Sequence, residues 1–181
     1  MKNTFVVTFF SVALVGLLLI GNDNRNKEEI TLSSLNIPYA ALNTKAKTQV
    51  ECLAQNILFE AGSETPQGQL AVAMVTMKRT HSSAFPNNVC GVVRQKVNNV
   101  CQFSWWCDKK LQEKAVKYNY SPAEIRMLKQ ARKVAMEAYL NYGEIDDPTH
   151  GAMFYHANYV NPRWKFKKTT QIGTHIFYRK S

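Results

Sequence analysis

The sequence lacks low-complexity segments and internal repeats, and it is poor in glycine and proline. Only 8 glycines and 6 prolines occur among its 181 residues, far fewer than collagen-like or proline-rich disordered chains contain. Hydrophobic residues make up 45% of the chain and charged residues 20%, so the composition is that of a globular protein. The length suits one domain of ordinary size.

Charged residues are absent from Phe5–Ile20, which follows the short positive start Met1–Asn3. A helix of about 16 residues is about 24 Å long, which is shorter than the roughly 30 Å hydrocarbon core of a membrane. This length favours the core of a secretory signal over a full membrane span. No small-x-small cleavage pattern follows Ile20, so an uncleaved signal anchor in the inner membrane is the alternative. In both cases the domain is expected to be exported to the periplasm or cell envelope.

The chain is therefore divided into three parts. Residues 1–21 are interpreted as a signal peptide or signal anchor, residues 22–44 as a polar tether, and residues 45–181 as the folded domain. The tether is rich in asparagine, serine and charged residues, a composition typical of a linker.

No C-x-x-C pair occurs, although the chain has four cysteines: Cys52, Cys90, Cys101 and Cys107. Since common zinc sites use closely paired cysteines, neither a metal nor another cofactor is expected. A zinc site completed by a histidine is the alternative, with the candidates His81, His150, His156 and His175. An even number of cysteines in an exported chain instead indicates two disulfides, and four cysteines allow three pairings.

Acidic residues are outnumbered, with 13 Asp and Glu against 23 Lys and Arg, so the net charge is +10 at pH 7. Such an excess attracts a protein to polyanions such as nucleic acid, anionic lipid or an acidic cell envelope. The basic residues are spread along the chain, with one local run at Arg163–Lys168. No recognisable nucleic-acid-binding module accompanies them, and an exported domain has little access to nucleic acid. No nucleic-acid partner is expected.

The apolar pattern predicts a mainly helical domain. Apolar residues recur at three- and four-residue spacing from Lys45 to Ala61, as on one face of a helix. A second helix begins at Thr65-Pro66 and runs through about Lys78; it is apolar on nearly every side and should be buried. A short helix is predicted for Val89–Gln95. A capping box at Ser121 opens a long helix that ends near Asn141.

The C-terminal part of the sequence changes to a strand pattern, so the predicted fold class is α+β. Met153–Val160 and His175–Arg179 are rich in aromatic and β-branched residues and are predicted to be short strands. Before them, Lys96–Lys110 has no helical period but carries Trp105 and Trp106 between two cysteines. This stretch is interpreted as an ordered binding loop, with simple core packing of the tryptophans as the alternative.

Glu60 is the candidate catalytic acid. At about 100° per residue it falls beside Leu53 and Ile57 on the margin of the first helix's apolar face. A carboxyl group partly inside an apolar wall has its charged form disfavoured, so its pKa rises and it can act as a general acid near neutral pH. The alternative is an ordinary solvated glutamate at a helix end.

Six stretches, taken in order, resemble the SleB/CwlJ-type cell-wall hydrolases, the spore-cortex-lytic enzymes and their relatives in other bacteria and phages. They cover nearly everything from Val50 to Arg179: Cys52–Glu64, Gln67–Ala73, Phe85–Val93, Cys101–Asp108, Phe154–Ala157 and Ile172–Arg179. Each stretch is a weak match alone, but six in the family's order give a specific signal. The four cysteines resemble those of the exported, Gram-negative-type branch.

The resemblance implies a small lysozyme-like catalytic domain, with a short C-terminal β hairpin, that cleaves the glycan strands of peptidoglycan. The family's acidic pair, usually written Glu-Ala-Arg-Gly-Glu, falls on Glu60 and Glu64. The resemblance makes Glu60 the catalytic acid, and we assign Glu64 a supporting role. Gly62 and Ser63 stand where the family has its arginine and glycine, so this chain has the acid without that arginine.

Glycoside hydrolysis usually needs two carboxylates. Besides Glu60, the candidates are Glu64, which follows a glycine and need not face Glu60, and Asp108, which is more often a loop-capping residue. One glutamate is enough for a lytic transglycosylase, because it can protonate the glycosidic oxygen and then accept the proton of the muramic acid 6-hydroxyl. This reaction, reported for family members, is preferred here to muramidase-type hydrolysis.

In this interpretation Tyr155, His156 and Tyr178 line the cleft, with Trp105 and Trp106 as platforms for sugar rings. A packing or scaffold role is the alternative for each of them. The expected partner is peptidoglycan, bound by a monomer. Two other functions compete: an N-acetylmuramoyl-L-alanine amidase, which usually needs zinc, and a non-catalytic envelope-binding protein.

Overall fold

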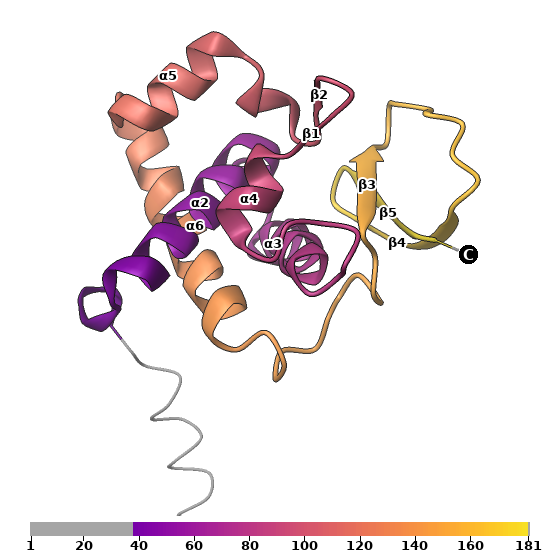
Figure 1. Ribbon diagram of the computed structural model, residues 1–181, viewed down its shortest axis with the longest axis horizontal. Coiled ribbons are helices and arrows are strands. Elements are labelled where there is room, and N and C mark those ends of the chain that lie inside the picture. The colour runs from indigo at the N-terminus through magenta and orange to yellow at the C-terminus, as the bar shows by residue number, and fades with distance from the viewer. Residues whose placement is uncertain (1–37, 181) are drawn as a thin grey trace, which may run out of the picture. The chain divides into compact units, whose positions relative to one another are not determined.

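The protein is described by a computed structural model that covers residues 38–180 (Figure 1). The predicted signal segment and most of the predicted tether lie outside the described residues. Across residues 38–180, no helix combines the length and the apolar character needed to cross a membrane.

The described chain is mainly helical and ends in a small sheet, as predicted; a two-stranded antiparallel sheet, β1-β2, also lies between the helices. In chain order the elements are the 3-10 helix η1 (Tyr39–Ala41), α2 (Thr44–Ala61), α3 (Pro66–Thr80), α4 (Val89–Arg94), β1 (Lys96–Val97), β2 (Val100–Cys101), the 3-10 helix η2 (Ser104–Trp106), α5 (Lys109–Lys117), α6 (Pro122–Leu140), β3 (Phe154–Ala157), β4 (Lys167–Ile172) and β5 (His175–Arg179).

The four helices predicted from the sequence are confirmed, and side chains cap their first turns. Asn43 accepts a hydrogen bond from the backbone of Ala46 at the start of α2. Thr65 does the same for α3, where Pro66 occupies the first turn. Ser121 and Glu124 form the predicted capping box of α6. These caps satisfy backbone N–H groups that have no partner within the helix.

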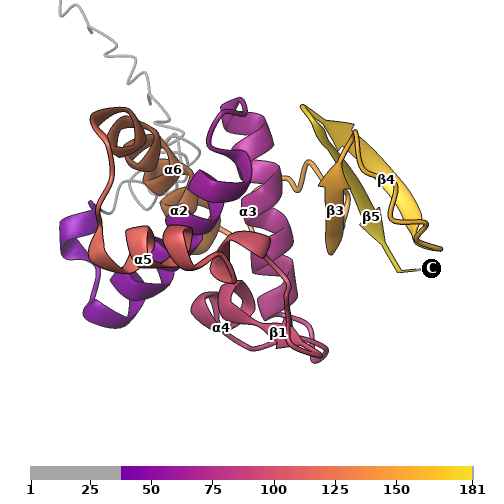
Figure 2. The ribbon, with the colours of Figure 1, turned by 90° about the horizontal axis from the view of Figure 1, so that it is seen from above.

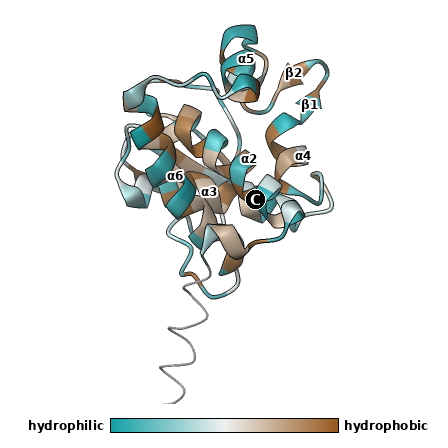
Figure 3. Cartoon of the chain, turned by 90° about the vertical axis from the view of Figure 1, so that its left-hand side faces the viewer, coloured by the Kyte–Doolittle hydropathy of each residue, from teal (hydrophilic) through white to brown (hydrophobic). Residues whose placement is uncertain are grey.

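Helix α5 is an element that the apolar pattern does not indicate. Ala115 is its one buried residue, so the helix lies on the surface and needs no broad apolar stripe. Figure 3 shows α5 largely in the colour of hydrophilic residues, whereas α3 and α4 are mainly in the hydrophobic range. Asp108 starts the helix, since its Oδ1 accepts hydrogen bonds from the backbone of Lys110 and Leu111.

The core is organised around α2, which packs against α3, α4 and α6 (Figures 1 and 2). Val50, Leu53 and Ile57 of α2 are fully buried, as their spacing predicted. Helix α3 is buried on nearly every side, because α2 covers one face and the sheet lies beside another (Figure 2). This arrangement places the C-terminal end of α2 next to the sheet.

The C-terminal sheet has three antiparallel strands in the order β3-β5-β4, one more than the predicted hairpin. Strand β4 lies at the edge of the sheet; half of its residues are exposed and none is fully buried. It therefore lacks the apolar alternation by which a half-buried strand is recognised. Strand β5 is central, and its Phe177 is fully buried against Ala71, Val75 and Ala152.

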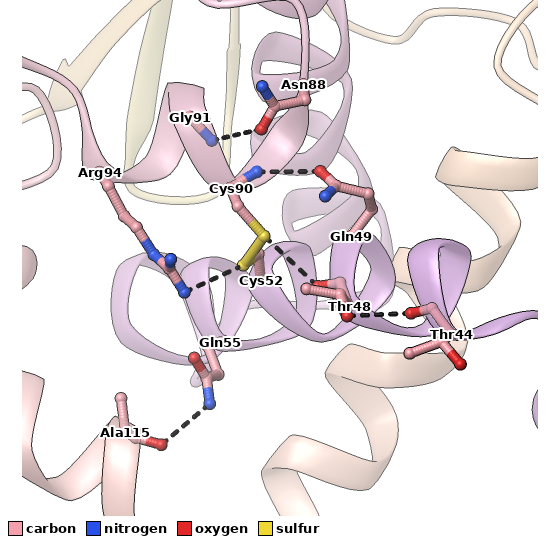
Figure 4. Close-up of a disulfide and its surroundings, with 10 residues drawn as sticks. All are labelled: Thr44, Thr48, Gln49, Cys52, Gln55, Asn88, Cys90, Gly91, Arg94 and Ala115. Carbon is pink, nitrogen blue, oxygen red and sulfur yellow. Dashed lines mark hydrogen bonds between the residues drawn. A yellow bond between two sulfur atoms is a disulfide. The ribbon is translucent and has the colours of Figure 1, made fainter.

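The cysteines form two disulfides, Cys52–Cys90 and Cys101–Cys107, so the disulfide prediction is confirmed and the pairing is established. The first joins α2 to α4 (Figure 4). Two polar contacts surround it: Gln49 Oε1 accepts a hydrogen bond from the backbone of Cys90, and Arg94 Nη2 lies 3.7 Å from Cys52 Sγ. The second closes a short loop, called the disulfide loop below. The four cysteines are all in the described part of the chain, and because each forms a disulfide, none has a thiolate that could bind zinc.

The folded domain begins before Lys45. Leu42 is buried in the core, and Tyr39 packs against it with its ring 5.4 Å from the guanidinium carbon of Arg132. Arg132 in turn forms a bidentate ion pair with Glu51 at 2.9 Å for each bond. The last residues of the segment predicted as a tether therefore pack onto the domain.

Candidate active site

Glu60 lies on the last turn of α2 and lines a cavity of about 510 Å³. Three parts of the fold form this cavity. The helices supply Glu60 and, from α3, Arg79; the disulfide loop forms a second wall; and the sheet supplies Tyr155 and His175. The site therefore depends on the packing of the helices against the sheet.

Glu60 is half-buried and bound to one neighbour, as its Oε2 accepts a hydrogen bond from the hydroxyl of Tyr155 at 3.1 Å. Burial raises the pKa of the Glu60 carboxyl, while the Tyr155 hydrogen bond and the charge of Arg79 act in the opposite direction. A raised pKa keeps a carboxyl group protonated closer to neutral pH, which is what a general acid requires.

Tyr155 and His175 form the sheet side of the site. Burial, and then the nearby Glu60, raise the pKa of the Tyr155 hydroxyl well above its usual range, so the hydroxyl stays protonated and donates to Glu60. The ring of His175 meets Tyr155 edge-on, with centroids 5.1 Å apart. Burial lowers the pKa of His175, so its imidazole is neutral at neutral pH. Its buried Nδ1 has no hydrogen-bond partner among the described residues.

Glu64 does not line this cavity; it joins the start of α3 to the turn between β4 and β5. Its Oε1 accepts hydrogen bonds from the Thr174 backbone at 3.1 Å and the Thr174 hydroxyl at 2.5 Å. The hydroxyl hydrogen bond is the main reason that the pKa of Glu64 is lowered. The structure therefore separates the two acidic residues that the resemblance pairs, because Glu60 lines the cavity and Glu64 links two elements.

Gly173 makes the link at Glu64 possible, so Gly173→Ala is expected to destabilise the domain. The residue has a φ of +55°, and an added Cβ would lie 1.9 Å from Glu64 Oε2. The free energy of unfolding should fall by about 1–3 kcal/mol, the usual cost of forcing an atom into packed structure. Denaturant unfolding measures the change. Gly143→Ala is the matched control, since its Cβ would meet nothing within 4 Å; equal effects of the two changes would contradict this role of Gly173.

The two tryptophans of the disulfide loop lie in different places. Trp105 lines the cavity but is only 3% exposed. Its ring stacks on Phe59 with centroids 4.6 Å apart, and its indole N–H donates to Asn56 Oδ1 at 2.9 Å. Trp105 is therefore part of the cavity wall, and little of its ring is exposed for stacking on a sugar ring. Trp106 lines a separate hollow, under the guanidinium of Arg94 at 5.0 Å.

His156 lines the cavity from β3, whereas Tyr178 lies behind it. The Nε2 of His156 is 3.0 Å from the Tyr178 hydroxyl, and the two rings stack with centroids 5.1 Å apart. Tyr178 therefore reaches the cavity only through His156. On the other side of the pair, the half-exposed ring of Trp164 contacts both residues edge-on.

Several cavity residues were not singled out from the sequence as binding residues, among them Arg79, Phe103 and Tyr159. Arg79 is 5% exposed and near the end of α3, where a basic residue is usually interpreted as a partner of the helix dipole. Phe103 and Tyr159 also line the cavity. The one sequence signal for Arg79 is a cation placed at the end of an otherwise apolar helix.

A model of the cell wall hydrolase family matches residues 63–178, which is more than half of the chain. The chain belongs to the cell wall hydrolase family. The match includes Glu64, the disulfide loop and the strands of the sheet, but it begins after Glu60. Membership of the family and the role of Glu60 are therefore separate questions, and the second depends on the geometry of the site.

Two relatives of this family member are spore cortex-lytic enzymes. The enzyme of Bacillus subtilis (strain 168) is 29% identical over 139 residues, which is 73% of this chain and 38% of the relative. The enzyme of Oceanobacillus iheyensis is 25% identical over 166 residues, which is 87% of this chain and 49% of the relative. The chain thus spans less than half the length of either relative.

Two solved structures share the fold. The catalytic domain of the Bacillus cereus SleB protein matches with a TM-score of 0.56 and 25% identity, over 76% of this chain and 94% of that one. The catalytic domain of the germination-specific lytic transglycosylase SleB from Bacillus anthracis matches with a TM-score of 0.52 and 22% identity, over 79% and 100%. The predicted SleB-like α+β fold is confirmed.

Gly62, which stands where the resemblance implies an arginine, lies in tight packing. Gly62 is the C-cap of α2, and an added Cβ would lie 2.4 Å from the Leu58 carbonyl oxygen and 2.8 Å from Met127 Cε. Backbone atoms cannot move aside as a flexible side chain can. A side chain at position 62 would therefore require the backbone or Met127 to shift, and the groups that act on the Glu60 carboxyl are Tyr155 and Arg79.

Proposed function

We propose that this chain is a peptidoglycan-degrading enzyme that cleaves the MurNAc-GlcNAc glycan strand as a lytic transglycosylase. The observation that carries the proposal is the position of Glu60, a half-buried carboxyl group with a raised pKa in the wall of a cavity. Membership of the cell wall hydrolase family and the names of the relatives, which are spore cortex-lytic enzymes, support peptidoglycan as the substrate.

In the proposed reaction Glu60 acts first as an acid and then as a base. The protonated carboxyl gives its proton to the glycosidic oxygen, and the bond between this oxygen and the anomeric carbon of MurNAc breaks. The 6-hydroxyl oxygen of the same MurNAc then bonds to the anomeric carbon, and its proton passes to the Glu60 carboxylate. No water is consumed, the product ends in a 1,6-anhydro ring, and Glu60 regains its starting state.

Tyr155 supports both steps in this scheme. Its hydroxyl donates to Glu60 Oε2, so it fixes one oxygen of the carboxyl group and leaves the other free to face the sugar. A hydrogen bond to a charged group is stronger than one to a neutral group. The Tyr155 contact therefore strengthens when Glu60 becomes a carboxylate, which is the moment at which a buried charge most needs a partner.

The distribution of carboxylates favours this reaction over hydrolysis with two acids. Among the described residues, the cavity is lined by one carboxylate besides Glu60, that of Asp108. Asp108 is exposed, and its Oδ1 is held by two backbone N–H groups at the start of α5. Its position is explained by helix capping, whereas a muramidase-type hydrolase needs a second carboxylate that activates water or attacks the sugar.

The products distinguish the two reactions. Purified sacculi digested by the enzyme are expected to yield muropeptides with 1,6-anhydromuramic ends and no new reducing ends, as measured by mass spectrometry. Asp108→Asn keeps a capping oxygen and should retain the same products at a rate within a few-fold of wild type. New reducing ends, together with a large loss of rate in Asp108→Asn, would instead identify a two-carboxylate hydrolase.

The remaining alternatives give different results in the same assay. An amidase would release peptides from intact glycan strands. A non-catalytic envelope-binding protein would release nothing, and its binding to sacculi would not depend on Glu60. Each outcome is visible in one digestion of purified peptidoglycan.

We place the proposed reaction outside the cytoplasm, in the periplasm or cell envelope. Two disulfides suit an oxidising compartment, and the substrate lies there. The net charge of +10 suits an acidic polymer and an anionic membrane surface. The N-terminal apolar segment, which lies outside the described residues, is proposed as the export signal or as an anchor in the inner membrane.

A further inference from the structure

Arg79 is an unusual feature of the cavity, because it is a charged side chain fixed on several sides. It is 5% exposed, and its Nε donates a hydrogen bond to the Met153 carbonyl at 2.8 Å. Its guanidinium carbon lies 5.2 Å from the ring centroids of both Phe85 and Phe103 and 5.7 Å from that of Phe154. These four contacts come from three separate parts of the chain and leave the guanidinium little freedom to move.

The guanidinium is close to Glu60 but is not paired with it. Each group influences the ionisation of the other, yet no nitrogen of Arg79 lies within 4.0 Å of a carboxylate oxygen among the described residues. The Nη1 of Arg79 is buried without any hydrogen-bond partner in the described part of the chain. Arg79 is thus held at a distance from the nearby acid while one of its donors remains unused.

This separation matters for an acid that must also serve as a base. A direct ion pair would hold Glu60 ionised at neutral pH, and no proton would be available for the glycosidic oxygen. With no positive charge nearby, the buried carboxylate left after proton transfer would be very unfavourable. A cation fixed just beyond contact leaves the resting acid protonated and still stabilises the carboxylate when it forms.

We propose that Arg79 is a positioning residue that stabilises the transient Glu60 carboxylate from a distance fixed by its aromatic and carbonyl contacts. This inference rests on the function proposed above and adds a residue to it. Arg79 acts through Glu60 and not on the sugar. Of the Lys and Arg residues in the described chain, it alone lines the cavity.

The other groups that face Glu60 come from the remaining walls. From β3, Tyr155 is protonated and donates to Glu60, and His156 also lines the cavity, with its Nε2 3.0 Å from the Tyr178 hydroxyl. From β5, His175 is neutral at neutral pH because burial lowers its pKa. From the start of α5, the Asp108 carboxylate also lines the cavity, with Oδ1 held by backbone N–H groups. None of these groups carries a permanent positive charge, so none can take over the proposed role of Arg79.

Removal of the charge is expected to change the pH profile in a defined direction. A general acid must be protonated, so activity is lost as the pH rises through its pKa. Arg79 lowers the pKa of Glu60; without the charge this pKa rises, and the alkaline limb moves to higher pH. Because no Arg79 nitrogen lies within 4.0 Å of a carboxylate oxygen among the described residues, the limb should move by an amount on the order of 1–2 pH units at an effective dielectric constant of about 20. The rate at the plateau should fall about 10- to 100-fold, because the carboxylate loses its stabilisation in the transition state.

Three substitutions test the proposal with purified sacculi as substrate. Arg79→Met removes the charge and places a flexible apolar side chain of similar length between the rings of Phe85, Phe103 and Phe154. Arg79→Gln is a second neutral variant, used if Arg79→Met does not fold. Both should show the slower rate and the shifted alkaline limb. Arg79→Lys keeps the charge and should return the limb to near its wild-type position. Circular dichroism melting shows which variants are folded.

Arg94→Gln is the matched control, since it removes one positive charge that contacts Trp106 and the Cys52 disulfide away from the cavity. It should leave the alkaline limb unchanged. Folded neutral Arg79 variants that are slow but keep the wild-type limb would overturn the inference and give Arg79 a purely structural role. An identical limb in Arg79→Lys and Arg79→Met would overturn it as well. The function proposed above fails separately, if Glu60→Gln retains its activity.

Discussion

Glu60→Gln is expected to give a folded domain that still binds sacculi but cleaves them at least about 10²–10⁴-fold more slowly, the usual range for loss of a general acid-base residue. The substitution keeps the size and polarity of the side chain and removes the transferable proton. The Tyr155 hydroxyl can still donate to the amide oxygen in place of Glu60 Oε2, so the packing of the site should persist. Release of soluble muropeptides and sedimentation with sacculi measure the two properties separately.

Glu137→Gln is the control for Glu60→Gln, since Glu137 is an exposed glutamate on α6. It should behave as wild type in both assays. Glu64→Gln should lose less activity than Glu60→Gln, because Glu64 binds Thr174 and does not line the cavity. Full activity of folded Glu60→Gln on purified sacculi would contradict the proposed function.

Of the variants predicted here, the one without the Cys52–Cys90 disulfide should lose the most free energy of unfolding. The bond closes a sequence separation of 38 residues, for which the loop-entropy argument gives about 4 kcal/mol. It also joins α2, the centre of the core, to α4. The double variant Cys52→Ala/Cys90→Ala, compared with wild type by denaturant unfolding under non-reducing conditions, measures this loss.

The second disulfide is the matched comparison. Cys101–Cys107 closes a separation of only 6 residues, and the same argument gives about 2 kcal/mol for Cys101→Ala/Cys107→Ala. The loop that it closes forms one wall of the cavity. Loss of this disulfide should therefore reduce the rate of sacculus cleavage, even though the free energy of unfolding falls less than in the Cys52–Cys90 variant. The prediction for Cys52–Cys90 is wrong if the two double variants lose equal stability, or if the short-loop variant loses more.

The helices could be predicted from the sequence because local signals coincide with the tertiary contacts. The apolar spacing of α2 predicted a buried face, and Leu53 and Ile57 lie there fully buried. Capping residues such as Thr65 and Ser121 mark helix starts by chemistry that depends on nearby backbone alone. The margin position of Glu60 follows from the same helical period.

The features that could not be predicted depend on distant contacts. Strand β4 is held by pairing with β5 and has almost no buried side chain of its own, so its residues carry little periodic signal. Arg79 follows a run of apolar residues like any basic residue at the end of a helix. Its special environment comes from Phe85, Phe103 and Phe154, which the sequence places in three other segments.

The tryptophans and Glu64 show a second limit of sequence interpretation. Trp105 and Trp106 are adjacent, yet one is a buried cavity wall and the other faces a different hollow. Their residue type marked them as candidate binding residues, but the direction of each side chain is set by the 3-10 helix η2, in which adjacent side chains point about 120° apart. Glu64 is likewise one of the two acidic residues that the resemblance pairs, and only the position of Thr174 reveals that it is bound to the turn between β4 and β5.

The contacts around Arg79 determine when the surroundings of Glu60 can form as the chain folds. The guanidinium is held by the turn before α4, the disulfide loop and the start of β3, so the surroundings of the acid assemble only when segments far apart in the chain have come together. In an unfolded chain Glu60 lies in water, with an ordinary carboxyl group and no cavity. Under the function proposed above, cleavage of peptidoglycan is therefore confined to molecules that have completed folding.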